Sequence, residues 1–208
     1  MVTGASFPYG VDRARELAHR LLARMDSRWR HTAGVAGRAE ELALTVPIAE
    51  RAVLVAAAWL HDIGYAEPLV LTGFHPLDGA RYLDRQGWPP RISALVAHHS
   101  GARLIARELG VSELLNAYPQ ESSAVADALT CADQTVGHQG ERLAIRERLA
   151  EVLRRHGPDS PHARVHAVRG PYLLEIAERV ERRLAEVLVP APGECTGWQG
   201  VDTGRNWT

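Results

Sequence analysis

The sequence predicts an all-α protein, and three observations lead to this fold class. Apolar residues recur with the helical period along most of the chain. No segment of useful length alternates between apolar and polar residues, as a half-buried strand would. Proline and glycine stand where the periodic segments begin and end. We therefore expect one helical domain over residues 1–189 and a flexible tail over 190–208.

Three helices are expected in the first half of the domain. Segments 11–25 and 31–44 each place apolar residues on one face and charged residues opposite. The segment 48–62 follows Pro47, is followed by Gly64, and is apolar on all sides in its middle. We therefore expect 48–62 to be the central buried helix.

Five further helices are expected in the second half. Pro76 and Pro90 open two short helices that end near Gly87 and Gly101. Longer helices are predicted over residues 122–135, 141–157 and 171–188. Beyond Pro190 the chain is rich in glycine and polar residues and has no period.

Composition excludes several classes of function. The formal net charge is -1, so charge alone predicts no binding to DNA or RNA duplexes or to a membrane surface. All 24 basic residues are arginine, which excludes Schiff-base and P-loop lysine chemistry. Two distant cysteines form no disulfide framework. The longest apolar run, residues 52–60, is shorter than the about 20 residues of a membrane span. The first ten residues do not resemble a signal peptide, and we expect a cytoplasmic protein.

Ionisable side chains occupy positions that should be buried. His31 shares a helix face with apolar residues, His61 and Asp62 end the most apolar helix, and Asp133 lies among small residues. Burying such groups is costly unless a partner compensates. A divalent cation would compensate, because imidazole and carboxylate are metal ligands and helical bundles build metal sites from facing helices. The sequence therefore predicts a metal site.

The order His31, then His61–Asp62, then Asp133 resembles the H…HD…D signature of the HD-domain metal-dependent phosphohydrolase superfamily. This similarity covers about residues 25–135 and leaves the C-terminal helices, 141–189, outside it. The segments "FHPLDGARYL" and "VAHHSGA" are similar to the additional histidine segments of two-metal members. The fold implied is a helical HD-domain bundle.

The resemblance also implies a ligand set for two divalent ions, which could be Fe, Mn, Co, Zn or Mg. The first ion would be held by His31, His61, Asp62 and Asp133. Asp62 would bridge to a second ion, held by His75 and by one or both of His98 and His99. Neighbouring helical residues point about 100° apart, so we favour His99 as the ligand. His98 is then a second choice, or a proton donor to the leaving group.

The function implied is hydrolysis of a nucleotide or related phosphate ester by a hydroxide that bridges the metals. Asp62 and His98 are the expected catalytic residues. Arg142 and Arg146, together with Arg148, are candidates for substrate contacts, although a solvated helix face is the ordinary explanation for them. Two alternatives stay open: a di-iron oxygenase of the same superfamily and a non-catalytic nucleotide-sensing module. A homodimer is the expected oligomer.

Overall fold

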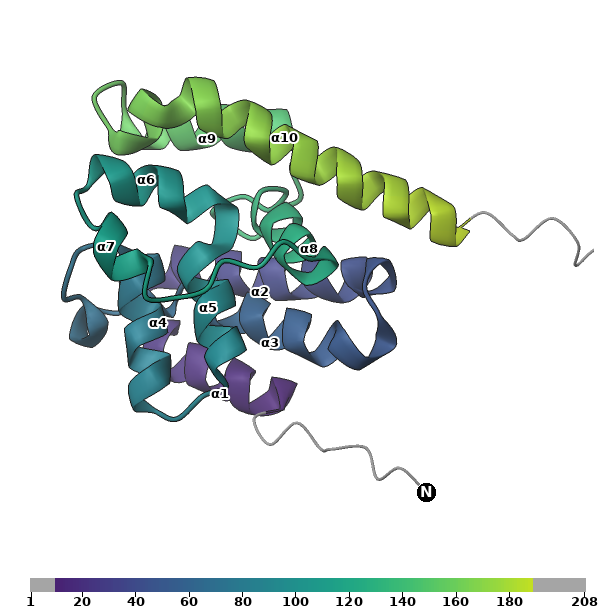
Figure 1. The fold of residues 1–208 in the computed structure, drawn as a ribbon, viewed down its shortest axis with the longest axis horizontal. Helices are drawn as coiled ribbons and strands as arrows, with labels where there is room; N and C mark the ends of the chain where they lie inside the picture. Colours follow the sequence, from purple (N-terminus) through teal and green to yellow (C-terminus); the bar gives the residue numbers. More distant parts are fainter. Residues whose placement is uncertain (1–9, 189–208) are drawn as a thin grey trace, which may run out of the picture.

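The computed structural model describes residues 10–188, and every regular element in this range is helical (Figure 1). Within these residues, β-pairing is limited to one isolated bridge between Val136 and Arg142. The predicted all-α fold is therefore confirmed. The predicted tail over 190–208 lies outside the described residues. None of the helices of 10–188 combines the length and the apolar character that crossing a bilayer requires.

The first three helices pack against one another and contain the central buried helix. They are α1 (Val11–Leu22), α2 (Asp26–Leu42) and α3 (Arg51–Leu60). Every α3 residue from Leu54 to Leu60 is buried, as its uniformly apolar sequence predicts. The expected helix over 48–62 is shorter than predicted. It begins as a 3₁₀ turn (Ile48–Glu50), and Asp62 has left the helical region with φ -106° and ψ 5°.

The middle of the chain forms α4 (His75–Arg85), α5 (Pro90–His98), α6 (Ala102–Glu108) and α7 (Ser112–Leu115). Two short 3₁₀ turns, η3 (Ile63–Tyr65) and η4 (Glu67–Leu69), connect α3 to the loop before α4. A third turn, η5 (His99–Gly101), separates α5 from α6. Ser100 and Gly101 there have φ values of 52° and 71°, and these left-handed conformations redirect the chain. The sequence did not predict α6 or α7.

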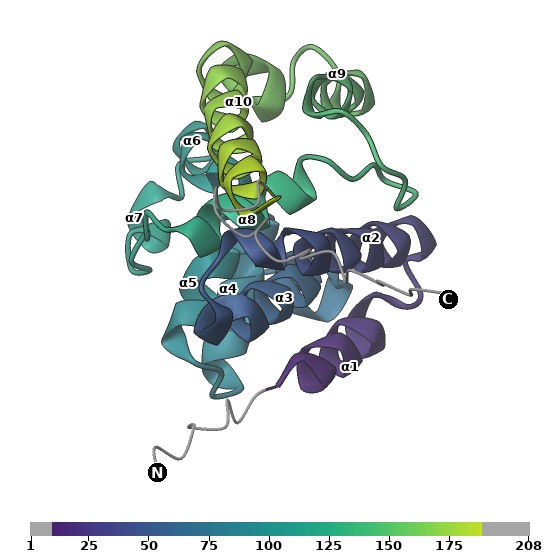
Figure 2. The same cartoon turned by 90° about the vertical axis from the view of Figure 1, so that its right-hand side faces the viewer.

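The last three helices are α8 (Ala124–Asp133), α9 (Ile145–His156) and α10 (Pro161–Leu188). α8 is largely buried and packs against α2, α3 and α10. In both views α9 and α10 lie on the side of the molecule away from α1 (Figure 2). The predicted start of α10 at residue 171 is wrong, because the helix begins at Pro161 and continues through Pro171. Burial of Val165 and Arg169 on the inner face accompanies this extension.

Candidate metal centre

His31 is brought to the centre of the site by α2. Its Nε2 lies 3.0 Å from Asp133 Oδ1, and its Nδ1 lies 3.0 Å from the carbonyl oxygen of Gly137. Gly34 permits this approach, because a Cβ at residue 34 would lie 2.8 Å from the carbonyl oxygen of Gly140. The absence of a side chain one turn after His31 therefore lets the loop 136–140 support the imidazole.

His61 and Asp62 lie where α3 ends. His61 Nδ1 is 2.7 Å from the carbonyl oxygen of Ala58, one turn earlier. Its Nε2 is buried, has no hydrogen-bond partner among the described residues, and lies 3.4 Å from Asp62 Oδ2 and 4.0 Å from Asp133 Oδ1. The end of α3 thus presents an imidazole nitrogen and a carboxylate to the same small space.

His75 and His99 complete the cluster from α4 and η5. His75 Nε2 lies 3.2 Å from Asp62 Oδ1 and 3.3 Å from His99 Nε2. His99 Nδ1 is 2.7 Å from the carbonyl oxygen of Val96. Gly64 allows α4 to approach, because a Cβ there would lie 2.0 Å from the carbonyl oxygen of His75.

Each buried carboxylate accepts its direct hydrogen bonds from non-histidine donors on Oδ2, while Arg148 lies 3.8 Å from Asp133 Oδ1. Arg28 donates to Asp62 Oδ2 at 2.5 Å. The Ser100 hydroxyl and the Gln134 amide donate to Asp133 Oδ2. The remaining oxygens, Asp62 Oδ1 and Asp133 Oδ1, face imidazole nitrogens.

The tautomers of three histidines make the site suitable for a cation. In His31, His61 and His99, Nδ1–H donates to a backbone carbonyl, so Nε2 is the ring atom that is left to bind a cation in the cluster. This arrangement is the one by which proteins orient histidine ligands. Lone pairs and carboxylate oxygens that face one another repel unless a positive charge lies between them. The residues therefore fit a divalent metal ion.

Two overlapping groups of donor atoms meet this requirement. One contains His31, His61 and Asp133, and the other contains His61, Asp62 and His99. All of these residues are buried, and the ligand atoms within each group lie within 4.8 Å of one another. His75 lies beside the second group, close to both Asp62 and His99.

The electrostatics of the cluster keep its acids ionised. Burial alone would raise the pKa of Asp62, but Arg28 and His61 outweigh it and hold this pKa well below its usual range. Asp133 behaves in the same way, with His31 as its strongest partner. Burial lowers the pKa of His99 to about 3, so its imidazole is neutral at physiological pH. An ionised carboxylate and a neutral imidazole are the forms that bind metals.

A pocket of about 290 Å³ borders the cluster. Its lining contains the cluster residues His31, Asp62, His75, His99 and Asp133. Four arginines also line it, namely Arg28, Arg148, Arg155 and Arg169, which come from α2, α9 and α10. The site therefore combines acceptors that suit cations with guanidinium groups that suit anions.

The structure brings six of the predicted ligands together and separates three other predicted residues from them. His31, His61, Asp62, His75, His99 and Asp133 form the cluster. His98 lies elsewhere, and its Nε2–H donates to the carbonyl oxygen of Tyr118 at 2.8 Å. Arg142 is exposed and pairs with Glu41, and the exposed Arg146 does not line the pocket.

Several pocket residues were missed from the sequence. Arg28 precedes His31 by three residues and shares its helix face, so this spacing could have indicated it. Tyr65 lines the pocket with its ring stacked on His75 and beneath Arg28. His156 and His162 also line the pocket. No local pattern indicates Arg155 or Arg169, which are placed by the packing of α9 and α10.

Comparison with known proteins supports the reading of this site. The HD domain model matches residues 28–153, which is more than half of the chain and includes all six residues of the cluster. Searches of curated proteins and of solved structures found no significant match. HD domains are generally metal-dependent phosphohydrolases. With its ligand cluster assembled from five helical elements, the chain belongs to the HD domain family.

Proposed function

We propose that this protein hydrolyses a small phosphate ester with the help of divalent metal ions. The observation that carries the proposal is Arg169, which is buried in the pocket lining. Its Nε donates to the carbonyl oxygen of Ser100 at 3.0 Å, and no carboxylate among the described residues forms an ion pair with it. Burial lowers the pKa of Arg169, and the negative charge of Asp133 offsets this only in part. A buried guanidinium without a carboxylate at ion-pair distance is costly, so the arrangement favours an anionic ligand.

The neighbouring arginines support the same ligand. Burial and the positive charges of Arg148 and Arg28 lower the pKa of Arg155, although Glu151 partly offsets them. Arg148 pairs with Glu151, but its buried Nε has no hydrogen-bond partner among the described residues. Guanidinium groups gathered in this way bind phosphoryl oxygens well, because they donate charge-assisted hydrogen bonds.

Each group of residues then has a separate role in the proposed reaction. His31, His61, Asp62, His75, His99 and Asp133 would hold two metal ions. When bound, these ions supply an activated water molecule and Lewis acidity at the phosphoryl group. Arg148, Arg155 and Arg169 bind the phosphoryl oxygens and neutralise the charge that develops on them. Phe74, Ile105 and Val152 form an apolar part of the wall that limits access of bulk water.

His98 has no role in this proposal, because it does not line the pocket. The same holds for Arg142 and Arg146. The arginine-rich lining favours phosphate chemistry over C–H oxidation by the oxygenase alternative, which does not require an anionic substrate. A nucleotide stays the substrate class that the family resemblance suggests, and a cytoplasmic location and a homodimer also stay predictions.

Metal analysis combined with phosphate release from a panel of nucleotides and simple phosphate esters tests this proposal. We expect bound divalent metal and turnover in the wild type, and loss of both in Asp62→Ala. Arg169→Ala should keep its metal but raise KM by about 10- to 100-fold, the effect of losing a charge-assisted hydrogen bond. Arg182→Ala, on an exposed arginine of the same helix outside the lining, is the matched control. Full turnover in Asp62→Ala, or no phosphate release by the metal-loaded wild type, would contradict the proposal.

A further inference from the structure

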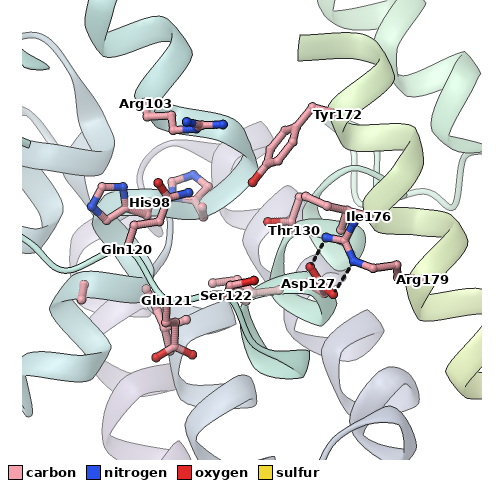
Figure 3. A pocket seen from close by; sticks show the side chains of 15 residues that line it. His98, Arg103, Gln120, Glu121, Ser122, Asp127, Thr130, Tyr172, Ile176 and Arg179 are labelled. Carbon is pink, nitrogen blue, oxygen red and sulfur yellow. Dashed lines mark hydrogen bonds and ion pairs between the residues drawn. The ribbon is translucent and has the colours of Figure 1, made fainter. Parts of the chain in front are cut away.

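A second pocket lies beside the metal centre, between α5, α8 and α10 (Figure 3). Its volume is about 370 Å³, within the range of small-molecule sites. His99 lines both pockets, but the remaining lining is different and includes His98, Arg103 and Tyr172. This second pocket therefore needs an explanation that the proposed hydrolysis does not supply.

The acids of the second pocket are already neutralised. Asp127 accepts hydrogen bonds from Arg179 at 2.6 and 3.0 Å, drawn in Figure 3, and from Arg183 at 2.8 Å. Glu121 accepts two hydrogen bonds from Arg91, at 2.8 and 3.0 Å. Since each carboxylate has a guanidinium partner, the second pocket does not offer a cation site.

Hydrogen-bond donors in the second pocket are, in contrast, uncommitted. Among residues 10–188, Arg103 has no ion-pair partner, and its guanidinium carbon lies 5.7 Å from the ring centroid of Tyr172. No hydrogen bond to a described residue involves the Tyr172 hydroxyl. Thr130 Oγ1 accepts from the Ser100 amide, which leaves its own proton free to donate. Figure 3 shows the Tyr172 and Thr130 hydroxyls directed into the same space. One cation and two hydroxyl donors around a pocket are suited to an anion.

The rest of the lining determines the size and polarity of a ligand. Ala94, Leu95, Leu129 and Ile176 provide an apolar wall next to the donors. An inorganic ion would leave most of this wall in contact with water, whereas an apolar body attached to the anionic group would cover it.

We propose that the second pocket binds a small organic anion. Its carboxylate or phosphate would be bound by Arg103, Tyr172 and Thr130, and its apolar body would pack on Leu95 and Ile176. The pocket that borders the candidate metal centre is called the metal-side pocket here. The second site is independent of the proposed hydrolysis, because its ligand contacts involve none of the arginines of the metal-side pocket.

Calorimetric titration of the full chain tests the site, with metal removed by a chelator so that no probe binds through a metal ion. Three probes share one ring: phenyl phosphate, benzoate and the neutral benzyl alcohol. We expect saturable binding of at least one anionic probe and none of benzyl alcohol, and the preferred anion identifies the head group. Arg103→Ala should weaken this binding about tenfold or more, and Tyr172→Phe about threefold.

Two controls distinguish this site from general electrostatic attraction and from the metal-side pocket. Arg107→Ala removes an exposed arginine one turn further along α6, outside the lining. Arg155→Ala weakens any binding of an anionic probe in the metal-side pocket. Arg107→Ala should bind the probe as the wild type does, and the binding that Arg103→Ala removes should persist in Arg155→Ala. Absence of saturable binding, equal binding by Arg103→Ala and wild type, or equal losses in Arg103→Ala and either control would overturn the proposal.

Discussion

Two buried regions of this protein contain aspartates of nearly equal exposure but with opposite surroundings. Asp78, at the start of α4, is 0% exposed and accepts hydrogen bonds from the backbone amides of Leu71, Thr72 and Gly73 and from the Thr72 hydroxyl. Asp133, in the candidate metal centre, is 6% exposed. Ser100 and Gln134 donate to its Oδ2, but its Oδ1 faces the imidazole nitrogens of His31 and His61, with Arg148 at 3.8 Å. The chain satisfies the first carboxylate by itself, whereas the second is arranged for a cation.

This contrast separates a structural acid from a ligand more clearly than burial does. A carboxylate that accepts from several N–H and O–H groups needs no further partner. A carboxylate oxygen that faces imidazole nitrogens gains stability when a positive ion or a proton occupies the space between them. The difference therefore predicts different consequences for the two regions.

The largest expected effect is on turnover in Asp62→Asn. Asparagine keeps the shape of the side chain but loses its charge, so the variant should lose its metal. Its kcat/KM should fall by more than about 100-fold, a larger effect than the loss of a residue that only hydrogen-bonds to a metal ligand. Asp78→Asn should stay within about tenfold of the wild type once folded. Phosphate release and metal content, measured on both variants, check this, and equal losses would remove the distinction.

A second expectation reverses the comparison, with stability as the measured quantity. Asp78→Ala should lower the free energy of unfolding by about 3 kcal/mol, because it leaves three backbone amides of the loop 71–73 without their acceptor. Urea denaturation of the metal-free protein measures this. Asp84→Ala, on an exposed residue of α4, should change stability by less than about 1 kcal/mol. If Asp78→Ala loses less than about 1 kcal/mol, water replaces the carboxylate as the acceptor for these amides.

Metal removal should lower the stability of the folded state only in proteins whose candidate metal centre is intact. At a free metal concentration 100 times Kd, binding stabilises the folded state by about 2.7 kcal/mol. Thermal unfolding with Mn²⁺ and with chelator should show this difference in the wild type and in a folded Asp78→Asn variant, but not in Asp62→Asn. A metal-dependent shift in Asp62→Asn of wild-type size would place the ion elsewhere.

The smallest effect concerns Glu121, a partly exposed acid. Burial raises its pKa, but Arg91 and Ser123 outweigh this and lower it overall. The stability that ionised Glu121 contributes is fully present above the unfolded pKa of about 4.3. It is lost as the pH falls through the lower pKa of Glu121 in the folded protein. Glu121→Gln should therefore reduce stability at pH 7 by less than about 1 kcal/mol, with no difference in strong acid. A difference that grows as the pH falls below 4 would contradict this sign.

Four of the proposed ligands, His31, His61, Asp62 and Asp133, have a local signal of burial in the sequence, whereas His75 and His99 were expected from the family resemblance. His31 lies on an apolar helix face, and His61 and Asp62 end the most apolar helix. The choice between His98 and His99 needed the structure, since it depends on the end of α5 and the left-handed Ser100. Arg169 could not be predicted, because its position depends on the start of α10 at Pro161 and on packing against η5.

Calorimetric titration of the chelated protein with Mn²⁺ tests the central claim most directly. The wild type should bind with saturation, and His61→Ala should bind far more weakly, because the unpartnered His61 Nε2 belongs to both groups of donor atoms. His98→Ala removes the histidine next to His99 that lies outside the cluster, and this variant should bind Mn²⁺ as the wild type does. Equal Mn²⁺ affinity in His61→Ala and the wild type would contradict the account.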